Sequence, residues 1–230
     1  MRLVAVLIVL GTIAGTCSWI VAQDGGGNGN GPKRPLDLPS GGAGDDEDDE
    51  DAPESITFYG AEYEGDAFFW CLDKSCSMGW GGEIGTLKSE MTQSIGELSA
   101  RAEFSMVAFS DNNLVWSYQP RRANAGNKGN ATSWVSSLQA AGGTCLGPAA
   151  VQTINIANQC SKRRRQVLIL GDGVPSCSVS GNCSAVQGDI NSANFQNLPV
   201  HTLYISASSD GIVCFQQIAA QNNGTFTLVN

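Results

Sequence analysis

The sequence is poor in histidine and in positive charge, and both shortages exclude function classes. His201 is the one histidine among 230 residues, so no second histidine is available to build a base relay with it. The chain also lacks a Walker loop and a G-x-S-x-G nucleophile elbow. Its 13 basic residues are outnumbered by 22 acidic ones, whereas surfaces that bind nucleic acid are predominantly basic. We therefore expect neither catalysis by His201 nor a nucleic-acid partner.

The excess negative charge is concentrated in one short segment. Residues 45–54 read DDEDDEDAPE and carry eight carboxylates, while the chain from Ser55 onward has 12 acidic and 10 basic residues, a net charge of −2. Residues 23–54 as a whole are rich in Gly, Asn, Pro and Asp and have almost no apolar side chains. Such a segment cannot bury enough surface to offset its ordering entropy. We expect a disordered, solvated linker over 23–54, with loose calcium binding by the acidic run as the alternative.

The first 22 residues have the pattern of an export signal. Arg2 precedes an uncharged, mostly apolar stretch that ends at the small residue Ala22, which is the order of a secretory signal peptide. An uncleaved membrane anchor is the alternative, because about 20 apolar residues can span a bilayer. In either case the rest of the chain is expected to be secreted or displayed on the cell surface or envelope. A membrane would be a partner only if the segment stays uncleaved.

Residues 55–230 alternate between apolar strands and amphipathic helices, which predicts a single α/β domain. The run AFFWCLD (67–73) is typical of a strand buried on both faces, and residues 83–100 place apolar side chains at helical spacing. The other expected strands are 102–110, 113–119, 165–171, 198–206 and 224–229, and the other expected helices are 133–138, 148–158 and 211–221. This order predicts a three-layer fold: an open, mostly parallel sheet, one short antiparallel edge strand at 113–119, and helices on both faces.

Oxygen-bearing side chains follow the ends of the predicted strands. Asp73 ends the first buried strand and is followed by Ser75 and Ser77, Thr144 follows a Gly-Gly pair, and Asp172 follows the strand 165–171. In open α/β sheets, ligands bind beyond the carboxyl ends of the strands. Two carboxylates and three hydroxyls, with no histidine among them, suit a hard cation such as Mg²⁺, Mn²⁺ or Ca²⁺. The neutral hydroxyls would leave water and an open coordination position on the ion.

Each of these residues also has a simpler interpretation. Ser75 and Ser77 could cap the helix that follows them, and Thr144 could cap another. Asp172 with Gly173 could form an ordinary turn. These interpretations do not explain why all three loops are expected at one edge of the sheet.

The three loops together resemble the von Willebrand factor A family over about residues 67–229. The motifs stand in the family's order: D-x-S-x-S, then G-G-T, then D-G. The resemblance implies a metal-ion-dependent adhesion site formed by Asp73, Ser75, Ser77, Thr144 and Asp172. Gly171 departs from the pattern, since the family usually has Thr or Ser before the aspartate, but that position is not a ligand.

The resemblance implies a non-enzymatic function, namely metal-dependent binding of a protein or matrix ligand. The ligand would present a carboxylate to the ion. Two alternatives stay open: a hydrolase that uses the same ion to activate water, and an envelope scaffold with a non-essential metal site. Loss of binding in EDTA favours adhesion, substrate turnover favours the enzyme, and metal-indifferent function favours the scaffold.

The cysteines of an exported chain are expected to form disulfides. Cys177 and Cys183 flank a short loop, and we predict that they pair. Cys76 and Cys145 belong to two loops that must meet at the ion, and we predict a second pair there. Cys160 ends a helix that should run toward the opposite edge of the sheet, so it is the residue expected to stay unpaired.

Overall fold

The computed structural model describes residues 52–177 and 182–229. The expected signal peptide or anchor over 1–22 lies outside the described residues, as does the expected linker over 23–54 apart from its last three positions. None of the helices in the two described stretches is both long and apolar enough to cross a membrane.

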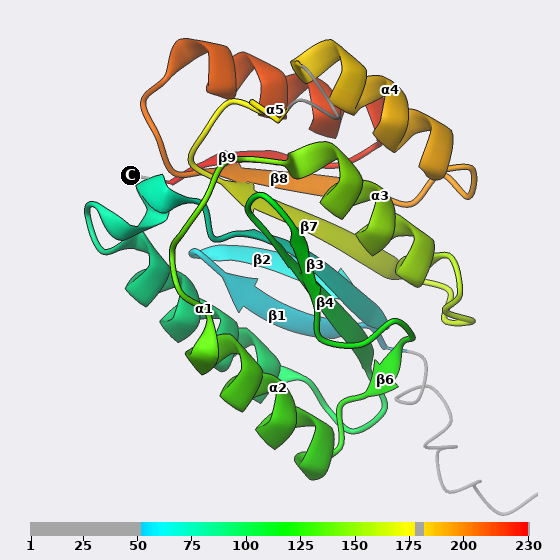
Figure 1. Ribbon diagram of the computed structural model, residues 1–230. Coiled ribbons are helices and arrows are strands. Elements are labelled where there is room, and N and C mark those ends of the chain that lie inside the picture. Colours follow the sequence, from blue (N-terminus) through cyan, green and yellow to red (C-terminus); the bar gives the residue numbers. More distant parts are fainter. Residues whose placement is uncertain (1–51, 178–181, 230) are drawn as a thin grey trace, which may run out of the picture. The chain divides into compact units, whose positions relative to one another are not determined.

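A mostly parallel sheet forms the centre of the domain, as predicted (Figure 1). Its strands run in the order β5-β4-β3-β7-β8-β9, and β6 also pairs with β4. Only β5 and β6 are antiparallel to their neighbour. The strands are β3 (Ala67–Asp73), β4 (Glu103–Phe109), β5 (Asn113–Val115), β6 (Arg121–Arg122), β7 (Arg165–Gly171), β8 (Val200–Tyr204) and β9 (Phe226–Leu228).

Helices cover both faces of this sheet, which confirms the predicted three layers. Alternate residues of a strand point to opposite faces, and β3 is buried at all seven positions. Phe68, Trp70 and Leu72 pack with the helices α1 (Glu83–Glu97) and α2 (Ala125–Ser137). Phe69 and Cys71 pack with the helices α3 (Leu146–Ala157), α4 (Cys183–Ala193) and α5 (Ser209–Gln221) on the other face (Figure 1). The continuous apolar run of β3 therefore builds two cores at once.

A β-hairpin that the sequence patterns did not predict precedes β3. Its strands are β1 (Glu54–Phe58) and β2 (Ala61–Gly65), joined at Tyr59 and Gly60, which both have positive φ, the pattern of a tight two-residue hairpin turn. The hairpin forms a separate sheet beside α1. Glu90 accepts a hydrogen bond from the Tyr59 N–H (2.7 Å), and Glu97 accepts one from the Thr57 N–H (2.5 Å). Side chains of α1 thus satisfy backbone donors on the open edge of β1.

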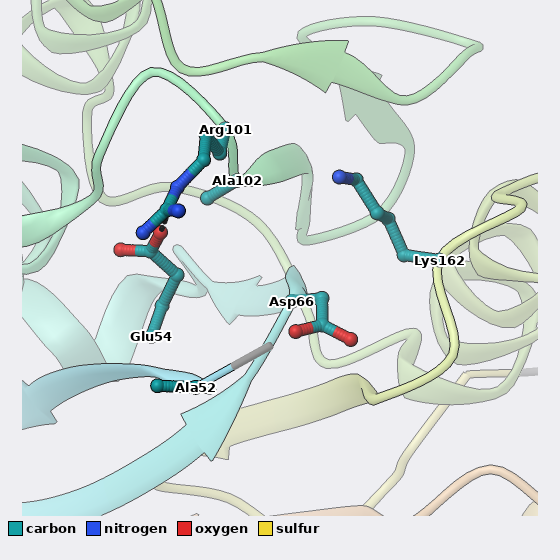
Figure 2. A pocket seen from close by; sticks show the side chains of 6 residues that line it. All are labelled: Ala52, Glu54, Asp66, Arg101, Ala102 and Lys162. Atoms are coloured by element: carbon teal, nitrogen blue, oxygen red, sulfur yellow. Dashed lines mark ion pairs between the residues drawn. The ribbon is translucent and has the colours of Figure 1, made fainter. Parts of the chain in front are cut away.

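The edge of the sheet at which the parallel strands begin carries a small surface pocket (Figure 2). It is lined by Ala52, Glu54, Asp66, Arg101, Ala102 and Lys162. Arg101 and Glu54 form a loose ion pair there, 4.0 Å apart, and Glu54 also accepts hydrogen bonds from the backbone and the hydroxyl of Ser99. Because Asp66 precedes β3 and Lys162 precedes β7, this pocket lies opposite the edge at which the predicted metal ligands follow their strands.

His201 belongs to a chain of hydrogen bonds at the same strand-start edge. The Thr225 N–H donates to His201 Nδ1 (3.1 Å), so the other ring nitrogen, Nε2, carries the proton and donates to Gln166 Oε1 (3.0 Å). Gln166 in turn donates to the Glu64 carbonyl (2.5 Å). These hydrogen bonds connect the residue before β9 with β8, β7 and β2, and the Tyr63 ring lies edge-on to the His201 ring with a centroid distance of 4.9 Å. This histidine is therefore a strand residue, as predicted, and it lies at the edge opposite the predicted metal ligands.

We predict that His201 makes the domain less stable in mild acid. Burial lowers the pKa of His201 to about 4, well below the usual value near 6.5. Between these values the unfolded chain binds a proton that the folded domain does not, so stability falls as the pH drops from about 6.5 to about 4. The ring is partly exposed, so we expect a loss of about 1–2 kcal/mol. Denaturant unfolding at pH 7 and pH 5 measures it, and an equal pH dependence in His201→Gln would contradict the prediction.

Candidate metal centre

Asp73 and Asp172 lie side by side at the edge where the strands end. Asp73 is the last residue of β3, and Asp172 follows the last residue of β7. These strands are parallel neighbours, with Leu72 paired to Leu170, so both carboxylates emerge at one edge. Asp73 is fully buried, and Asp172 is half-buried. The convergence predicted from the sequence is therefore present.

The serines of the first loop point their hydroxyls at Asp172. The Ser77 hydroxyl donates to Asp172 Oδ1 (2.8 Å), and the Ser75 hydroxyl lies 3.4 Å from the same oxygen and 3.1 Å from the Ser77 hydroxyl. The Ser75 backbone N–H donates to Asp73 Oδ1 (2.7 Å), which closes the loop. Ser75 occupies the N-cap position of the short 3-10 helix η2 (Cys76–Gly79), but its side chain makes no capping hydrogen bond. A capping role therefore does not explain Ser75.

Thr144 joins this group from the loop before α3. A Cβ atom at Gly173 would stand 3.2 Å from Thr144 Oγ1, so the hydroxyl lies against the residue that follows Asp172. The N-cap position of α3 belongs to Cys145, and no side chain caps that helix, so Thr144 is not a cap. The Ser176 N–H donates to the Thr144 carbonyl (3.2 Å), which joins the Thr144 loop to the loop after β7. All five predicted residues are thus gathered at one edge.

Within the described part of the chain, no lysine, arginine or histidine forms an ion pair with the carboxylate of Asp73 or Asp172. Burial is the largest effect on Asp73 and raises its pKa to about 7; hydrogen bonds from Ser75 lower the pKa, and the charge of Asp172 raises it. Burial also raises the pKa of Asp172. Asp73 Oδ2 is buried and makes no hydrogen bond. A hydrogen bond from the Asp172 backbone N–H to the Asp73 carboxyl group lowers its pKa, but by less than burial raises it. The adjacent Lys74 donates to the Ser110 hydroxyl instead (2.9 Å).

This set of donors fits a hard divalent cation. A buried carboxylate oxygen without a partner is costly, and a cation bound at this edge would satisfy it. The available donors are carboxylate and hydroxyl oxygens, which suit Mg²⁺, Mn²⁺ or Ca²⁺ better than a soft metal. Nowhere in residues 52–177 or 182–229 do three Asp, Glu, His or Cys side chains gather as a metal-binding group. A site here would therefore depend on the hydroxyls as well as on the two acids.

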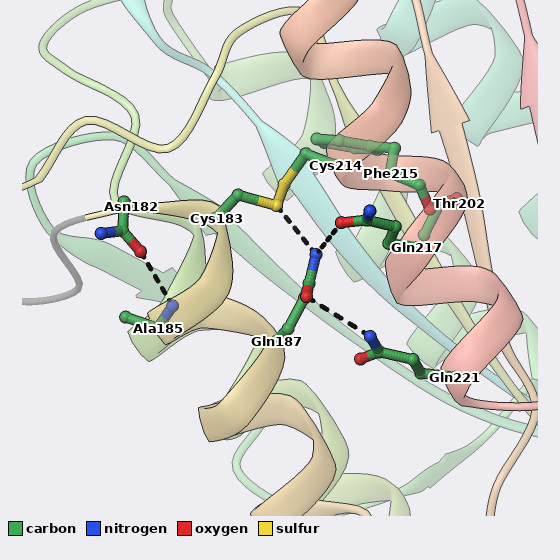
Figure 3. The surroundings of a disulfide bond; sticks show 9 residues. All are labelled: Asn182, Cys183, Ala185, Gln187, Thr202, Cys214, Phe215, Gln217 and Gln221. Atoms are coloured by element: carbon green, nitrogen blue, oxygen red, sulfur yellow. Dashed lines mark hydrogen bonds between the residues drawn. A yellow bond between two sulfur atoms is a disulfide. The ribbon is translucent and has the colours of Figure 1, made fainter.

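The two disulfides differ from both predicted pairs. Cys145 pairs with Cys177, and Cys183 pairs with Cys214. Cys177 is close to Cys183 in sequence, but it lies beside the Thr144 loop, whereas Cys183 begins α4 and faces α5 (Figure 3). Among the described residues Cys71, Cys76 and Cys160 are free, so Cys160 is unpaired as expected. Loops that meet at the site do share a disulfide, but its second cysteine is Cys177, not Cys76.

Packing around residue 171 explains why glycine stands at this position. A Cβ atom at this position would stand 2.8 Å from the ring of Phe215 on α5 and 3.3 Å from Asp73 Oδ2. Phe215 is buried, so its ring occupies the space that a Thr or Ser side chain would need. Glycine here allows α5 to pack tightly on β7, and it leaves Asp73 Oδ2 without a side-chain partner from residue 171.

We predict that Gly171→Thr destabilises the domain by about 1–3 kcal/mol, because the new side chain overpacks the core against Phe215. The double variant Gly171→Thr/Phe215→Leu should lose less than the sum of the two single losses, because the smaller ring-free side chain relieves the clash. Guanidinium unfolding of the four proteins in this cycle measures the coupling. Strictly additive losses would show that Phe215 is not what excludes a side chain at residue 171.

Comparison with known proteins supports this fold. No profile of a known protein family matches the chain. Inter-alpha-trypsin inhibitor heavy chain H4 of Homo sapiens is 26% identical over 129 residues, which is 53% of this chain. Those residues make up only 14% of the human protein.

A solved structure decides the fold. The von Willebrand factor type A structure from Catenulispora acidiphila matches 74% of this chain and 40% of its own, with a TM-score of 0.64 and 20% identity. The chain adopts the von Willebrand factor A fold. The von Willebrand factor domain of the pilus tip protein Mfa5 from Porphyromonas gingivalis matches with a TM-score of 0.57 and 8% identity, over 70% of this chain and 89% of that one. The pilus adhesin SpaC from Lactobacillus rhamnosus GG matches with a TM-score of 0.58 and 16% identity. The match covers 70% of this chain and 28% of SpaC.

Proposed function

We propose that this chain is an exported adhesion domain that binds a protein or surface ligand through a divalent cation. Asp73, Ser75, Ser77, Thr144 and Asp172 would hold the ion, with Mg²⁺ as the expected species and Mn²⁺ or Ca²⁺ as alternatives. The observation that carries the proposal is the buried, unpartnered Oδ2 of Asp73 at the edge where these oxygens converge. Similar folds in a pilus adhesin and a pilus tip protein support a role at a cell surface.

The residues of the site divide into two groups with different tasks. Asp73 supplies formal charge from the end of a strand buried at every position, so little ordering entropy remains to be lost on binding. Asp172 supplies the second charge, and the hydroxyls of Ser75 and Ser77 already contact it. Because the hydroxyls are neutral, a bound divalent ion would keep affinity for a ligand carboxylate. The two acids fix the ion, and the ligand's acid completes its coordination.

In the part of the chain that the structure describes, neither a histidine nor a free lysine is placed to act as the base of a hydrolytic reaction at this site. The single histidine lies near the start of β8, hydrogen-bonded to Gln166, at the edge opposite Asp73. The only basic residue in the first loop is Lys74, which is nearly buried and donates to Ser110. We therefore propose that the domain binds and releases its ligand without chemical change.

Adhesion in the presence and absence of metal tests the proposal. Beads coated with purified residues 23–230 should adhere to a panel of extracellular matrix and cell-surface proteins in Mg²⁺. They should detach in EDTA and re-attach when Mg²⁺ is restored. Asp73→Ala beads serve as the matched control and should not adhere. Adhesion that is unaffected by both EDTA and Asp73→Ala would support the scaffold alternative, and turnover of a substrate would support the hydrolase.

A further inference from the structure

Trp80 is an exposed aromatic side chain next to the proposed metal loop. Its exposure is 82%, the largest among the exposed large hydrophobic residues of the described chain. It follows η2 directly, and its backbone N–H donates to the Ser77 carbonyl (2.9 Å). The other described tryptophans, Trp70, Trp116 and Trp134, are buried or half-buried. A single exposed hydrophobic residue is common on protein surfaces, so exposure alone does not make Trp80 a ligand contact.

The turn that carries Trp80 is fixed by Glu83. The Gly81 N–H donates to Glu83 Oε2 (2.9 Å), and a Cβ atom at Gly81 would overlap the Glu83 carboxylate. The side chain of Glu83 can therefore fold back over the turn only because residue 81 is glycine. The backbone of Trp80 is held between this contact and its hydrogen bond to Ser77. The backbone that carries the indole is therefore held three residues from Ser77 of the proposed metal loop.

The surroundings of the site are acidic. Glu83 begins α1 shortly after η2, and its carboxylate folds back over the turn between them, where it accepts a hydrogen bond from the Gly81 N–H. Asp111 accepts a hydrogen bond from the Gly143 N–H (2.8 Å), next to Thr144. Asp210 lies in the first turn of α5, which follows the end of β8. We call Glu83, Asp111 and Asp210 the acidic rim.

Positive charge is concentrated at the other edge of the sheet. Seven of the ten basic residues after Ser55 precede or begin β4, β6 or β7. These seven are Arg101, Arg121, Arg122, Lys162, Arg163, Arg164 and Arg165. At the site edge, the cation nearest to Asp73 in sequence is Lys74, whose ammonium group is bonded to Ser110. A divalent ion would balance Asp73 and Asp172, but the acidic rim would stay negative and would repel a purely acidic ligand.

We infer that the ligand is a protein segment in which the metal-bound carboxylate has a lysine or arginine close by, and that this cation lies over the indole of Trp80. The inference rests on the proposed function and names the chemistry of its ligand. Tryptophan has the best aromatic face for a cation, and the acidic rim favours positive charge around the carboxylate. Exposed tryptophans in interfaces are also frequent sources of binding energy.

Selection from a random peptide library displayed on phage tests this chemistry. Purified residues 23–230 are immobilised, phage are bound in Mg²⁺, and bound phage are eluted with EDTA. The eluted peptides should share an Asp or Glu with a Lys or Arg within about three residues, the distance over which neighbouring side chains can reach one patch. Selection on Trp80→Ala should keep the acid and lose the enrichment of the basic residue.

A matched exposed aromatic provides the control. Phe195 is 69% exposed and lies between α4 and β8, at the strand-start edge. For one synthetic peptide from the selection, Trp80→Ala should weaken binding about 5- to 30-fold, and Phe195→Ala should leave it unchanged. Asp210→Asn should weaken binding of the same peptide, and the loss should be larger at low salt than at high salt. Replacing the peptide's lysine or arginine with norleucine should remove most of the effect of Trp80→Ala.

Different failures separate the two claims. Peptides that elute in EDTA, carry an acid, and show no basic residue or no sensitivity to Trp80→Ala would overturn the inference and leave the proposed function standing. Enrichment of aliphatic or aromatic residues in place of the cation would also overturn it. Peptides retained equally in EDTA and on Asp73→Ala would overturn the proposed function.

Discussion

Replacing Asp73 with alanine is expected to weaken Mg²⁺ binding at least about tenfold, or roughly 1.4 kcal/mol, without unfolding the domain. Asp73 brings formal charge to the ion from the fully buried end of β3. Its Oδ2 makes no hydrogen bond that would compete with a metal. Asp172→Ala should weaken binding similarly, and Ser75→Ala should weaken it less, because a hydroxyl supplies no formal charge. Calorimetric titration with Mg²⁺ and Mn²⁺ measures each loss.

Asp73→Asn is the matched control for the fold. Asparagine keeps the shape of the side chain and removes a buried charge that lies beside Asp172, so without metal it should be at least as stable as the wild type. With saturating Mg²⁺ the wild type should melt at a higher temperature than without it, because a ligand that binds only the folded state stabilises it. The variant should show a clearly smaller shift at the same Mg²⁺ concentration. Equal shifts in the two proteins would remove Asp73 from the site.

Removing the disulfide Cys145–Cys177 is expected to weaken both the fold and metal binding, whereas removing Cys183–Cys214 should weaken the fold alone. The two bonds have sequence separations of 32 and 31 residues, so each restricts the unfolded chain to nearly the same extent. Each should therefore stabilise the folded domain by about 3–4 kcal/mol. Only the first joins the Thr144 loop to the loop after Asp172. The second joins α4 to α5, where Gln187 also bonds Gln217 (2.8 Å) (Figure 3).

The paired alanine variants of each disulfide separate the two effects. Denaturant unfolding should give similar losses of stability for Cys145→Ala/Cys177→Ala and Cys183→Ala/Cys214→Ala. Titration with Mg²⁺, under conditions where both variants are folded, should show several-fold weaker binding for the first only. If both variants bind Mg²⁺ as the wild type does, the Cys145–Cys177 bond has no part in positioning Thr144.

The central sheet can be predicted from the sequence because its strands are locally unambiguous. Residues 67–72 and 167–171 are continuous runs without a polar side chain, and an aspartate follows each. Neighbouring parallel strands end at the same edge of a sheet. The short antiparallel strand at 113–115 also lies within its longer expected range. The same reasoning from strand ends places Asp73, Ser75, Ser77 and Asp172 at one edge of the sheet. Thr144 lies between two helices, α2 and α3, so its assignment to the site depends on the resemblance of the G-G-T motif.

Elements with weak local patterns are missed or misplaced. The helix expected at 133–138 begins at Ala125, because Asn124 caps it through the Asn127 N–H, although Gly126 and Gly129 disfavour a helix. The helix α4 is not among the expected elements, and Asn182 caps it in the same way. The β1–β2 hairpin depends on contacts from α1, such as Glu90 to Tyr59, which no local pattern reveals.

The details of the site depend on contacts across the fold. Cys145 follows Thr144, and Cys177 lies five residues after Asp172. Because these two cysteines form a disulfide, the expectation that loops meeting at the site share a disulfide is correct. Spacing alone cannot select Cys177 over Cys76. The glycine at position 171 is explained by the ring of Phe215, which arrives from a helix about 40 residues further along the chain.

The most direct test of the account is the location of a bound ion. Crystals of residues 23–230 grown or soaked with Mn²⁺ should give one strong anomalous peak at the end of β3 and β7. That peak should lie about 2.0–2.3 Å from the oxygens that bind the ion directly, and these should belong to the Asp73, Ser75, Ser77, Thr144 and Asp172 set. The remaining oxygens of the set should contact the ion through one water. The peak should be absent from Asp73→Ala crystals. No peak at this edge in the wild type, or an unchanged peak in Asp73→Ala, would contradict the central claim.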